Sequence, residues 1–373
     1  GGATVEGVSR DLSFGWAVNR GSMSDMVGMA VSYEDRQRDS APLQGRPIRV
    51  LYLFPGEAEG SAMIFAKKQV EAVREAGVAA ETFCLASRTD LRSLRREYAR
   101  LRGLMDSFRP DLVHAQYGTM TAFFASLITP VPLVITFRGS DLNPAPSDPW
   151  LRSALGRWLS QYAARKAARI ICVSEGLARR LWWARDRAVV LPSGVDTNLF
   201  VPRSRSDARQ ELGWAEEDRI VLFNAGLSPV VKRLDLAQAA VNEAVKECGP
   251  IRFVTLDGHV PHSTVATMLN GADCLLLTSD WEGSPTIVQE ALACNLPVLS
   301  VGVGDVRERL AGVVPSRIVE RNPQALGKGL AEMLARPVRS NGRAWTAPVA
   351  QDHIVRKTVD LYREVLGSKR AAC

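Results

Sequence analysis

Short apolar runs alternate with amphipathic segments along most of the chain, and this alternation constrains the fold more than any other feature. The first run, IRVLYLF at 48–54, precedes a glycine-containing turn and a helical pattern that ends at Gly77. Further apolar runs occupy 80–85, 112–115, 133–137 and 170–173, with helical patterns over about 90–108 and 121–127. Strands that alternate with helices predict a parallel sheet covered by helices on both faces.

The same pattern restarts at residue 219. Strands are expected at 219–224, 252–256, 274–278 and 297–300, and helices at 235–247, 265–270, 285–293 and 323–335. A chain of 373 residues suits two domains of ~150 to 200 residues each. We therefore predict an α/β protein of two Rossmann-like, doubly wound domains that face each other across a cleft.

The domain boundaries follow from this pattern. Residues 1–45 lack a sustained period and are expected to form a poorly ordered arm. The first domain is expected over 46–188 and the second over 189–350, with a final helix, 351–368, that packs back on the first. Ligands of such sheets bind beyond the carboxyl ends of the strands. The candidate loops therefore follow five strand ends: Phe54, Ala115, Phe137, Asn224 and Thr278.

Composition excludes several classes of protein. The 46% hydrophobic and 23% charged residues are ordinary for a globular protein, and no apolar run reaches the ~20 residues of a membrane span. The six cysteines form no CxxC pair, which favours a reducing cytoplasm, and no segment has the layout of a signal peptide. The four histidines and scattered acids form no ligand cluster, so no metal is expected. We expect a cytoplasmic protein whose membrane contact, where it has one, is peripheral at the inner face.

The segment DWEGSPTIVQE, at 280–290, carries the most chemistry. Ser284 is expected to be the N-cap, and Pro285 the first residue, of a helix. Free backbone N–H groups at that helix start would bind an anion such as a diphosphate. Glu282 lies in the loop before the helix and Glu290 nearly two turns into it. Two glutamates at this spacing also occur as ordinary surface charges, and the EGSP context argues against that alternative.

In this context the chain resembles the glycosyltransferases of the GT-B fold, specifically family 4, whose Glu-x7-Glu motif appears as Glu282-Gly-Ser-Pro-Thr-Ile-Val-Gln-Glu290. The following ALACNLPVLSVGVGDVRERL resembles members that build bacterial surface polysaccharides of the teichuronic-acid type. The resemblance covers nearly the whole chain after residue 46. It implies a retaining transfer without metal or other cofactor. The second domain would bind a UDP- or GDP-linked sugar donor, and the first a saccharide or lipid-linked saccharide acceptor.

The resemblance also assigns the donor-binding residues. It implies that Glu282 contacts the donor sugar as a catalytic residue and that Glu290 holds the ribose hydroxyls. The helix start supplies further donor contacts: Gly283, Ser284, Pro285 and Thr286. Across the expected cleft, the loop of Gly258, His259 and Val260 corresponds to the one that frames the nucleobase, although a surface position is the alternative for His259.

The loop AGLSPVVKR, at 225–233, corresponds to an Arg–Lys pair that neutralises the departing diphosphate in the family. Lys232 matches the Lys and is a candidate catalytic residue. The Arg position falls on Leu227 in an ungapped comparison, so Arg233 is the candidate substitute. The alternative is a solvated basic pair at a helix start.

His114 and Arg138 end strands of the first domain. The resemblance places the His that matches His114 beside the donor sugar as a catalytic candidate, whereas a lone His is more often structural. The stretch TFRGSD resembles the family's His-Gly-Ser-Asp, with Arg138 in place of the His. Arg138 would meet an acidic donor, an anionic acceptor or, as we favour, Asp141. Gly139 and Asp141 complete the acceptor or sugar-proximal group.

Four glycines at strand ends complete the candidate site. Gly56 and Gly60 flank the first strand–helix turn, where the backbone would approach the donor or acceptor closely. Gly226 and Gly258 lie in the expected donor loops. An ordinary turn explains Gly56 and Gly60 equally well.

Positive charge is concentrated in the first domain. The net charge is +7, seven arginines face three acids between 88 and 109, and nine basic residues face two acids between 151 and 187. Trp158, Trp182 and Trp183 lie in the second segment, and basic helices with aromatic residues can rest on anionic membranes. We expect the first domain to dock on an anionic membrane surface; a solvated arginine-rich face is the alternative.

Other functions fit the sequence less well. A nucleotide-sugar 2-epimerase needs acid–base residues and a phosphorylase needs a phosphate or cofactor pocket, and neither signature is visible. A non-catalytic sugar-nucleotide-binding relative stays open because the diphosphate Arg is missing. A nucleic-acid-binding protein would explain the charge, but the chain has no helix-turn-helix, zinc finger or aromatic platform, so no nucleic-acid partner is expected.

Overall fold

The computed structural model describes residues 46–56, 63–86, 91–143 and 149–371. The expected arm, 1–45, and Gly60 lie outside these residues. Both sheets belong to one unit, which spans residues 42–373. Within the described part of the chain, no helix combines the length and the apolar character needed to cross a membrane.

The first sheet has six parallel strands in the order β2-β1-β3-β4-β5-β6. Their bounds are β1 Arg49–Pro55, β2 Ala79–Leu85, β3 Leu112–Ala115, β4 Leu133–Phe137, β5 Arg169–Cys172 and β6 Ala188–Val190. β6 pairs with β5 through Val190, so the first sheet continues two residues beyond the expected domain boundary at 188.

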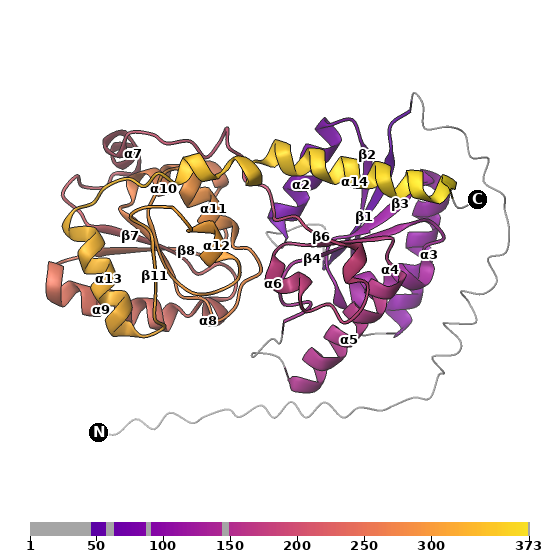
Figure 1. Ribbon diagram of the computed structural model, residues 1–373, viewed down its shortest axis with the longest axis horizontal. Coiled ribbons are helices and arrows are strands. Elements are labelled where there is room, and N and C mark those ends of the chain that lie inside the picture. Colours follow the sequence, from indigo (N-terminus) through magenta and orange to yellow (C-terminus); the bar gives the residue numbers. More distant parts are fainter. Residues whose placement is uncertain (1–45, 57–62, 87–90, 144–148, 372–373) are drawn as a thin grey trace, which may run out of the picture. The chain divides into compact units, whose positions relative to one another are not determined.

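Helices cover both faces of this sheet because both faces are apolar. The helices are α2 Ile64–Glu75, α3 Leu91–Phe108, α4 Thr119–Ile128, α5 Trp150–Lys166 and α6 Glu175–Ala178, and a 3-10 turn spans Arg185–Arg187. Leu51 and Leu53 share a core with α3, α4 and α5, whereas Val50 and Tyr52, on the opposite side of β1, pack against α2. The two layers are visible on either side of the sheet in Figure 1.

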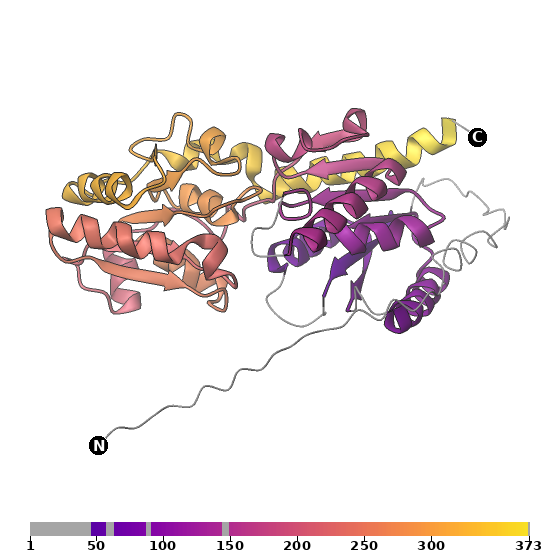
Figure 2. The ribbon, with the colours of Figure 1, turned by 90° about the horizontal axis from the view of Figure 1, so that it is seen from below.

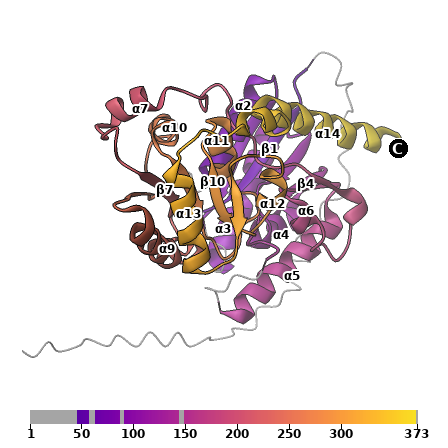
Figure 3. The same ribbon diagram turned by 60° about the vertical axis from the view of Figure 1, so that its left-hand side comes forward.

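The second sheet has five parallel strands in the order β11-β10-β9-β7-β8. The strands are β7 Ile220–Asn224, β8 Arg252–Leu256, β9 Cys274–Leu277, β10 Val298–Val301 and β11 Arg317–Val319. The helices are α7 Arg205–Leu212, α8 Pro229–Lys232, α9 Leu234–Cys248, α10 His262–Gly271, α11 Thr286–Ala293, α12 Val306–Arg309 and α13 Pro323–Ala335; two 3-10 turns span Gly342–Trp345 and Ala347–Val349. Helices α9 and α13 lie side by side (Figure 3). The two doubly wound domains predicted from the sequence are confirmed.

The last helix, α14 Gln351–Ala371, leaves the second domain and lies along the first. Val355, Val359 and Tyr362 join the core formed by β1 and α2. Figure 2 shows this helix, in yellow, along the first domain. Tyr362, near the end of the chain, therefore packs against β1, one of the strands that lead into candidate site loops of the first domain.

Candidate active site

Lys232 and Glu282 come together from two loops of the second domain. Lys232 ends the short helix α8, which follows β7, and Glu282 lies in the loop between β9 and α11. The Lys232 Nζ atom donates to Glu282 Oε1 at 2.6 Å, and Ser279 Oγ donates to the same oxygen at 2.7 Å. The two side chains are mostly buried, at 21% and 11% exposure, so the pair is held firmly at the strand ends. The sequence predicted both residues for the site but not that they pair with each other.

Helix α11 begins at Thr286, one residue later than expected, and Pro285 is its N-cap. The prediction that Ser284 caps this helix is wrong. The Ser284 hydroxyl donates to Asp305 Oδ2 at 2.7 Å and accepts from Gln289 Nε2 at 2.9 Å. A hydroxyl bound to a buried carboxylate is held more strongly than one that accepts from a backbone N–H. No side chain in the described part of the chain caps α11, which leaves its first amides available to an anion.

Glu290 lies one turn into α11 and is only 9% exposed. Burial raises the pKa of its carboxyl to about 7, and the positive charge of Lys68, on α2, opposes this rise only in part. No hydrogen bond contributes to the shift. A buried carboxyl without a hydrogen-bond donor can accept two adjacent ribose hydroxyls without first losing another partner.

Arg233 is already engaged by two carboxylates. It has a left-handed backbone conformation, with φ 58°, at the junction of α8 and α9. Its guanidinium binds Asp235 at 2.9 Å and Asp280 at 3.2 Å, and these hydrogen bonds raise its pKa. Leu227, which occupies the family's Arg position, is 58% exposed. To replace the family's Arg, Arg233 would therefore have to release one of these two carboxylates and bind the diphosphate instead.

Gly226 and Gly258 lie beside each other at the ends of β7 and β8. Both have positive φ, 52° and 86°, and a Cβ at Gly258 would lie 3.6 Å from the carbonyl carbon of Gly226. The following His259 is exposed, and its backbone N–H donates to Asp257 Oδ1 at 2.9 Å. Val260 follows in the same loop, where it is half-buried. The expected nucleobase loop is thus adjacent to the loop that carries Lys232.

The loop after β4 touches the loop that carries Glu282. A Cβ at Gly283 would overlap the carbonyl oxygen of Arg138 and lie 2.9 Å from its carbonyl carbon. A Cβ at Gly139, whose φ is 153°, would lie 3.4 Å from the backbone nitrogen of Gly283. These two glycines are required by this close approach of backbones. In the remaining glycine turn, Gly56 has φ 87° and its N–H donates to Leu85 O at 3.0 Å.

Asp141 does not pair with the guanidinium of Arg138, contrary to the interpretation we favoured. Its buried carboxylate accepts from the backbone N–H groups of Gly139 at 2.8 Å, Arg138 at 3.0 Å and Gly118 at 3.1 Å. Burial raises its pKa, and these hydrogen bonds oppose the rise. The carboxylate is satisfied by the backbone, so it shapes the loop rather than neutralising the arginine.

His114 is fully buried at the end of β3. Its Nε2 lies 2.7 Å from Thr136 Oγ1 and its Nδ1 lies 2.6 Å from the hydroxyl of Tyr362, which also lies 2.7 Å from that of Tyr52. Burial lowers the pKa of His114 to about 3, assisted by the charge of Arg138, so the ring is neutral. With both ring nitrogens engaged and no exposed surface, His114 has no free atom for a sugar. Its catalytic role stays a prediction.

Sequence reasoning missed four residues of this arrangement. They are Gln289, Asp305, Arg321 and Tyr362. Arg321 donates to the Thr278 and Ser279 carbonyls, at 3.0 and 2.7 Å, and to Asp280 at 3.1 Å. Asp305 follows a strand end, β10, which is the signal that could have identified it. Gln289 lies only five residues after Ser284, within the same motif, whereas Arg321 and Tyr362 are distant in sequence from the residues that they contact.

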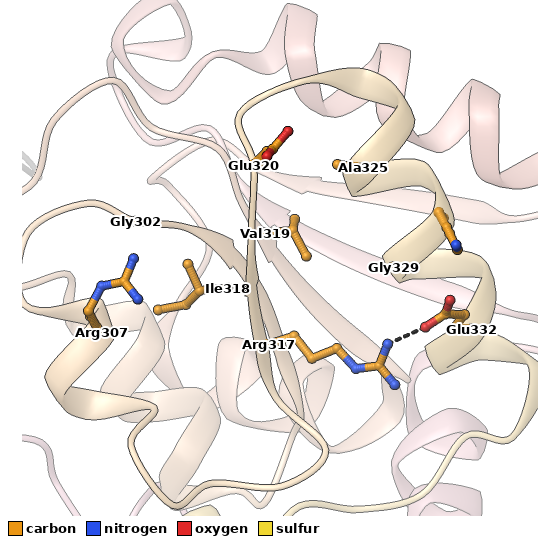
Figure 4. A pocket seen from close by; sticks show the side chains of 10 residues that line it. Gly302, Arg307, Arg317, Ile318, Val319, Glu320, Ala325, Gly329 and Glu332 are labelled. Carbon is orange, nitrogen blue, oxygen red and sulfur yellow. Dashed lines mark hydrogen bonds and ion pairs between the residues drawn. The ribbon is translucent and has the colours of Figure 1, made fainter.

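A hollow of about 580 Å³ lies elsewhere in the second domain, between β11 and α13. Arg317 and Glu332 form an ion pair across it (Figure 4). None of the predicted site residues that the structure describes lines it. It is therefore separate from the candidate active site.

Two family models match the chain, Glycosyltransferase Family 4 over residues 48–199 and Glycosyl transferases group 1 over residues 240–345. A relative named for teichuronic acid biosynthesis, the glycosyltransferase TuaC of Bacillus subtilis (strain 168), is 26% identical over 263 residues. The match covers 65% of this chain and 64% of that relative, just under two thirds of its length.

Two solved structures share the fold. Sucrose-phosphate synthase from Thermosynechococcus elongatus has a TM-score of 0.73 at 16% identity, covering 86% of this chain and 100% of that one. HepE from Anabaena, solved in complex with UDP, has a TM-score of 0.62 at 16% identity, covering 85% and 100%. The first family model matches the first domain and continues to residue 199, the second matches within the second domain, and the solved structures share the fold. The chain belongs to the GT-B glycosyltransferases of family 4.

Proposed function

We propose that this protein is a retaining, metal-independent glycosyltransferase that moves a sugar from a UDP- or GDP-linked donor to a saccharide or lipid-linked saccharide, in the synthesis of a bacterial surface polysaccharide or glycoconjugate. The observation that carries this proposal is the Lys232–Glu282 pair beside the uncapped start of α11, with Glu290 buried in the same helix. The name of the TuaC relative supports the proposed role in polysaccharide synthesis. The complexes of HepE with UDP and UDP-glucose support the proposed nucleotide-sugar donor.

The proposed chemistry is electrostatic. Lys232 and the first amides of α11 would take up the negative charge that develops on the leaving diphosphate. Lys232 would then turn from Glu282 to the phosphates, and the freed Glu282 carboxylate would accept a hydroxyl of the donor sugar. Positive charge at the leaving group is what a divalent cation would otherwise supply, which is why we propose that none is needed.

Nucleotide binding and turnover test the assignment separately. Calorimetry with UDP, GDP and ADP should identify one preferred nucleotide. Glu290→Ala should weaken its binding, whereas Glu282→Ala should bind it normally and lose turnover. Glu217→Ala, an exposed glutamate of the same domain, is the control for both measurements. Absence of binding by all three nucleotides would argue strongly against the proposal.

A non-catalytic sugar-nucleotide-binding relative is the second candidate. The observation in its favour is that Arg233 is bound to Asp235 and Asp280, so no arginine is free beside Lys232 in the described loops of this site. Product analysis separates the two functions, since a binding protein would retain the nucleotide-sugar unchanged. An epimerase would instead return a donor with altered sugar stereochemistry.

We further propose that the first domain rests on an anionic membrane surface. Six large apolar side chains of α5 and the segment after α6, here called the tryptophan patch, are 43–75% exposed: Trp150, Leu151, Leu155, Trp158, Trp182 and Trp183. The guanidinium of Arg165 lies 5.2 Å from the ring centre of Trp183, which links the two segments. Exposed basic residues flank the patch: Arg152, Lys166, Arg179, Arg180 and Arg185. Apolar rings beside cations favour an anionic lipid surface over water.

Vesicle sedimentation tests this proposal. The wild-type protein should pellet with vesicles that contain anionic lipid and much less with neutral ones. The double variant Trp150→Ser, Trp158→Ser should stay in solution, whereas Trp345→Ser, which alters a half-exposed tryptophan of the second domain, should behave as wild type. Equal pelleting with both kinds of vesicle, or with neither, would contradict the proposal.

A further inference from the structure

Arg138 lies at the carboxyl end of the first sheet, surrounded by loops and by α2. Its Nε donates to the Gln116 carbonyl at 3.1 Å, its Nη1 to Ser193 Oγ at 3.0 Å, and its Nη2 to the side-chain oxygens of Gln69 and Gln116. The guanidinium carbon also lies 4.9 Å from the ring centre of Phe65. These contacts come from the segments after β1, β3 and β6, so the guanidinium occupies the edge of the sheet where ligands bind.

Every hydrogen-bond acceptor that the described residues offer this guanidinium is neutral. Among the described residues no carboxylate forms an ion pair with Arg138, because Asp141 accepts from backbone N–H groups instead. Burial lowers the pKa of Arg138 to about 10, and the charge of Asp141 offsets this only in part. The side chain is half-buried, and a cation shielded in part from water without a counterion is unfavourable for the folded state.

Arg209 shows how this chain treats a purely structural buried arginine. It is 1% exposed, and its Nη2 donates to the buried Asp273 at 2.9 Å. Three backbone carbonyls accept its remaining hydrogen bonds. Arg138 has neutral partners, and within the described ranges no carboxylate pairs with it. A structural role therefore does not account for its charge.

The guanidinium can also donate one further hydrogen bond. Four of its five N–H groups match the acceptors named above, which leaves one N–H of Nη1 without an acceptor among the described residues. The backbone of the same residue touches Gly283, in the loop that carries Glu282. Lys68, half-buried one turn along α2 from Phe65, lies near enough to Glu290 to lower its pKa. Two cations of the first domain thus lie near the donor residues of the second.

We propose that Arg138 binds an anionic group, a carboxylate or a phosphate, on one of the substrates. The proposal rests on the proposed function and specifies its substrate class. The donor diphosphate is not this group, because Lys232 and the start of α11 are assigned to it in the other domain. The anion is either a carboxylate on the transferred sugar or an acidic group on the acceptor, and it supplies the charge that Arg138 lacks within the protein.

Paired probes that differ by one anionic group distinguish these sources. UDP-glucuronate and UDP-glucose differ only at the sugar's carboxylate and test the donor. Glucose 6-phosphate and glucose, each titrated into protein saturated with UDP, test the acceptor. Calorimetry should show that the wild-type protein prefers the anionic member of one pair about tenfold or more, the range of a charge-assisted hydrogen bond.

Three variants identify the residue responsible. Arg138→Gln should abolish the preference and leave the binding of UDP itself unchanged, and Arg138→Lys should retain part of it. Arg152→Gln, on the exposed side of α5, should match wild type. Equal binding of both members of both pairs, or a preference that survives in Arg138→Gln, would overturn the proposal. Failure of the wild type to bind UDP, GDP or ADP would refute the proposed function, whereas glucose 6-phosphate titrated without nucleotide would still report on Arg138.

Discussion

Donor binding should tighten about tenfold between pH 6 and pH 8 because of Glu290. Burial in α11 raises the pKa of this carboxyl to about 7 in the unliganded protein. If the ribose hydroxyls donate to the carboxylate form, the apparent Kd contains the factor 1 + 10^(pKa − pH). With this pKa the factor is about 11 at pH 6 and about 1.1 at pH 8, a ratio of about ten or ~1.4 kcal/mol.

Calorimetry with an intact UDP-sugar measures this dependence, since its diphosphate does not titrate between pH 6 and pH 8. At pH 7 about half of Glu290 is protonated, so binding should release about half a proton, visible as a dependence of the heat on the buffer. Glu290→Gln should bind weakly and equally at every pH. A wild-type Kd that is flat over this range, or a pH dependence that persists in Glu290→Gln, would refute the assignment of the ribose to the carboxylate.

Three further outcomes are expected. Asp273→Ala should lower the free energy of unfolding in urea by about 3–5 kcal/mol, because it leaves Arg209 buried and unpaired, whereas Asp360→Ala, in an exposed pair, should cost less than about 1 kcal/mol. Gly283→Ala should reduce transfer by about tenfold or more, measured as initial rate, because the added Cβ overlaps the backbone of the other loop. Glu290→Gln should be more stable than wild type to urea at pH 8 but not at pH 4. Its carboxyl has a raised pKa, so the wild type loses stability as the pH rises from the ordinary value of 4.5 to about 7.

Periodicity predicts most of the fold because it reports local burial. The expected strands at 112–115, 133–137 and 252–256 and the helix at 323–335 have the bounds found in the structure. β11 was missed because it has only three residues, none of them fully buried, at the edge of its sheet. Such a strand has too few apolar positions to show an alternating pattern.

The partners of the site residues were harder to predict than their positions. Ser284 has the composition of an N-cap, yet its hydroxyl binds Asp305, which lies 21 residues further along the chain. His114 binds Tyr362, 248 residues away on a helix that returns from the other domain. Local preference cannot anticipate a stronger acceptor, or a neighbouring side chain, that only the folded chain brings near.

Arg138 and Asp141 show why a charge in the sequence does not reveal its partner. Asp141 can reach the N–H groups of its own turn, Arg138 and Gly139, at little cost in conformational entropy. A pair with the Arg138 guanidinium would instead require one long side chain to be fixed and those N–H groups to stay buried without acceptors. The turn therefore takes the carboxylate, and the guanidinium is left with neutral acceptors at the ligand-binding edge of the sheet. Asp141, the nearest acid in the sequence, thus accepts hydrogen bonds from the loop backbone. We therefore expect the counterion of Arg138 to be an anionic group of a substrate.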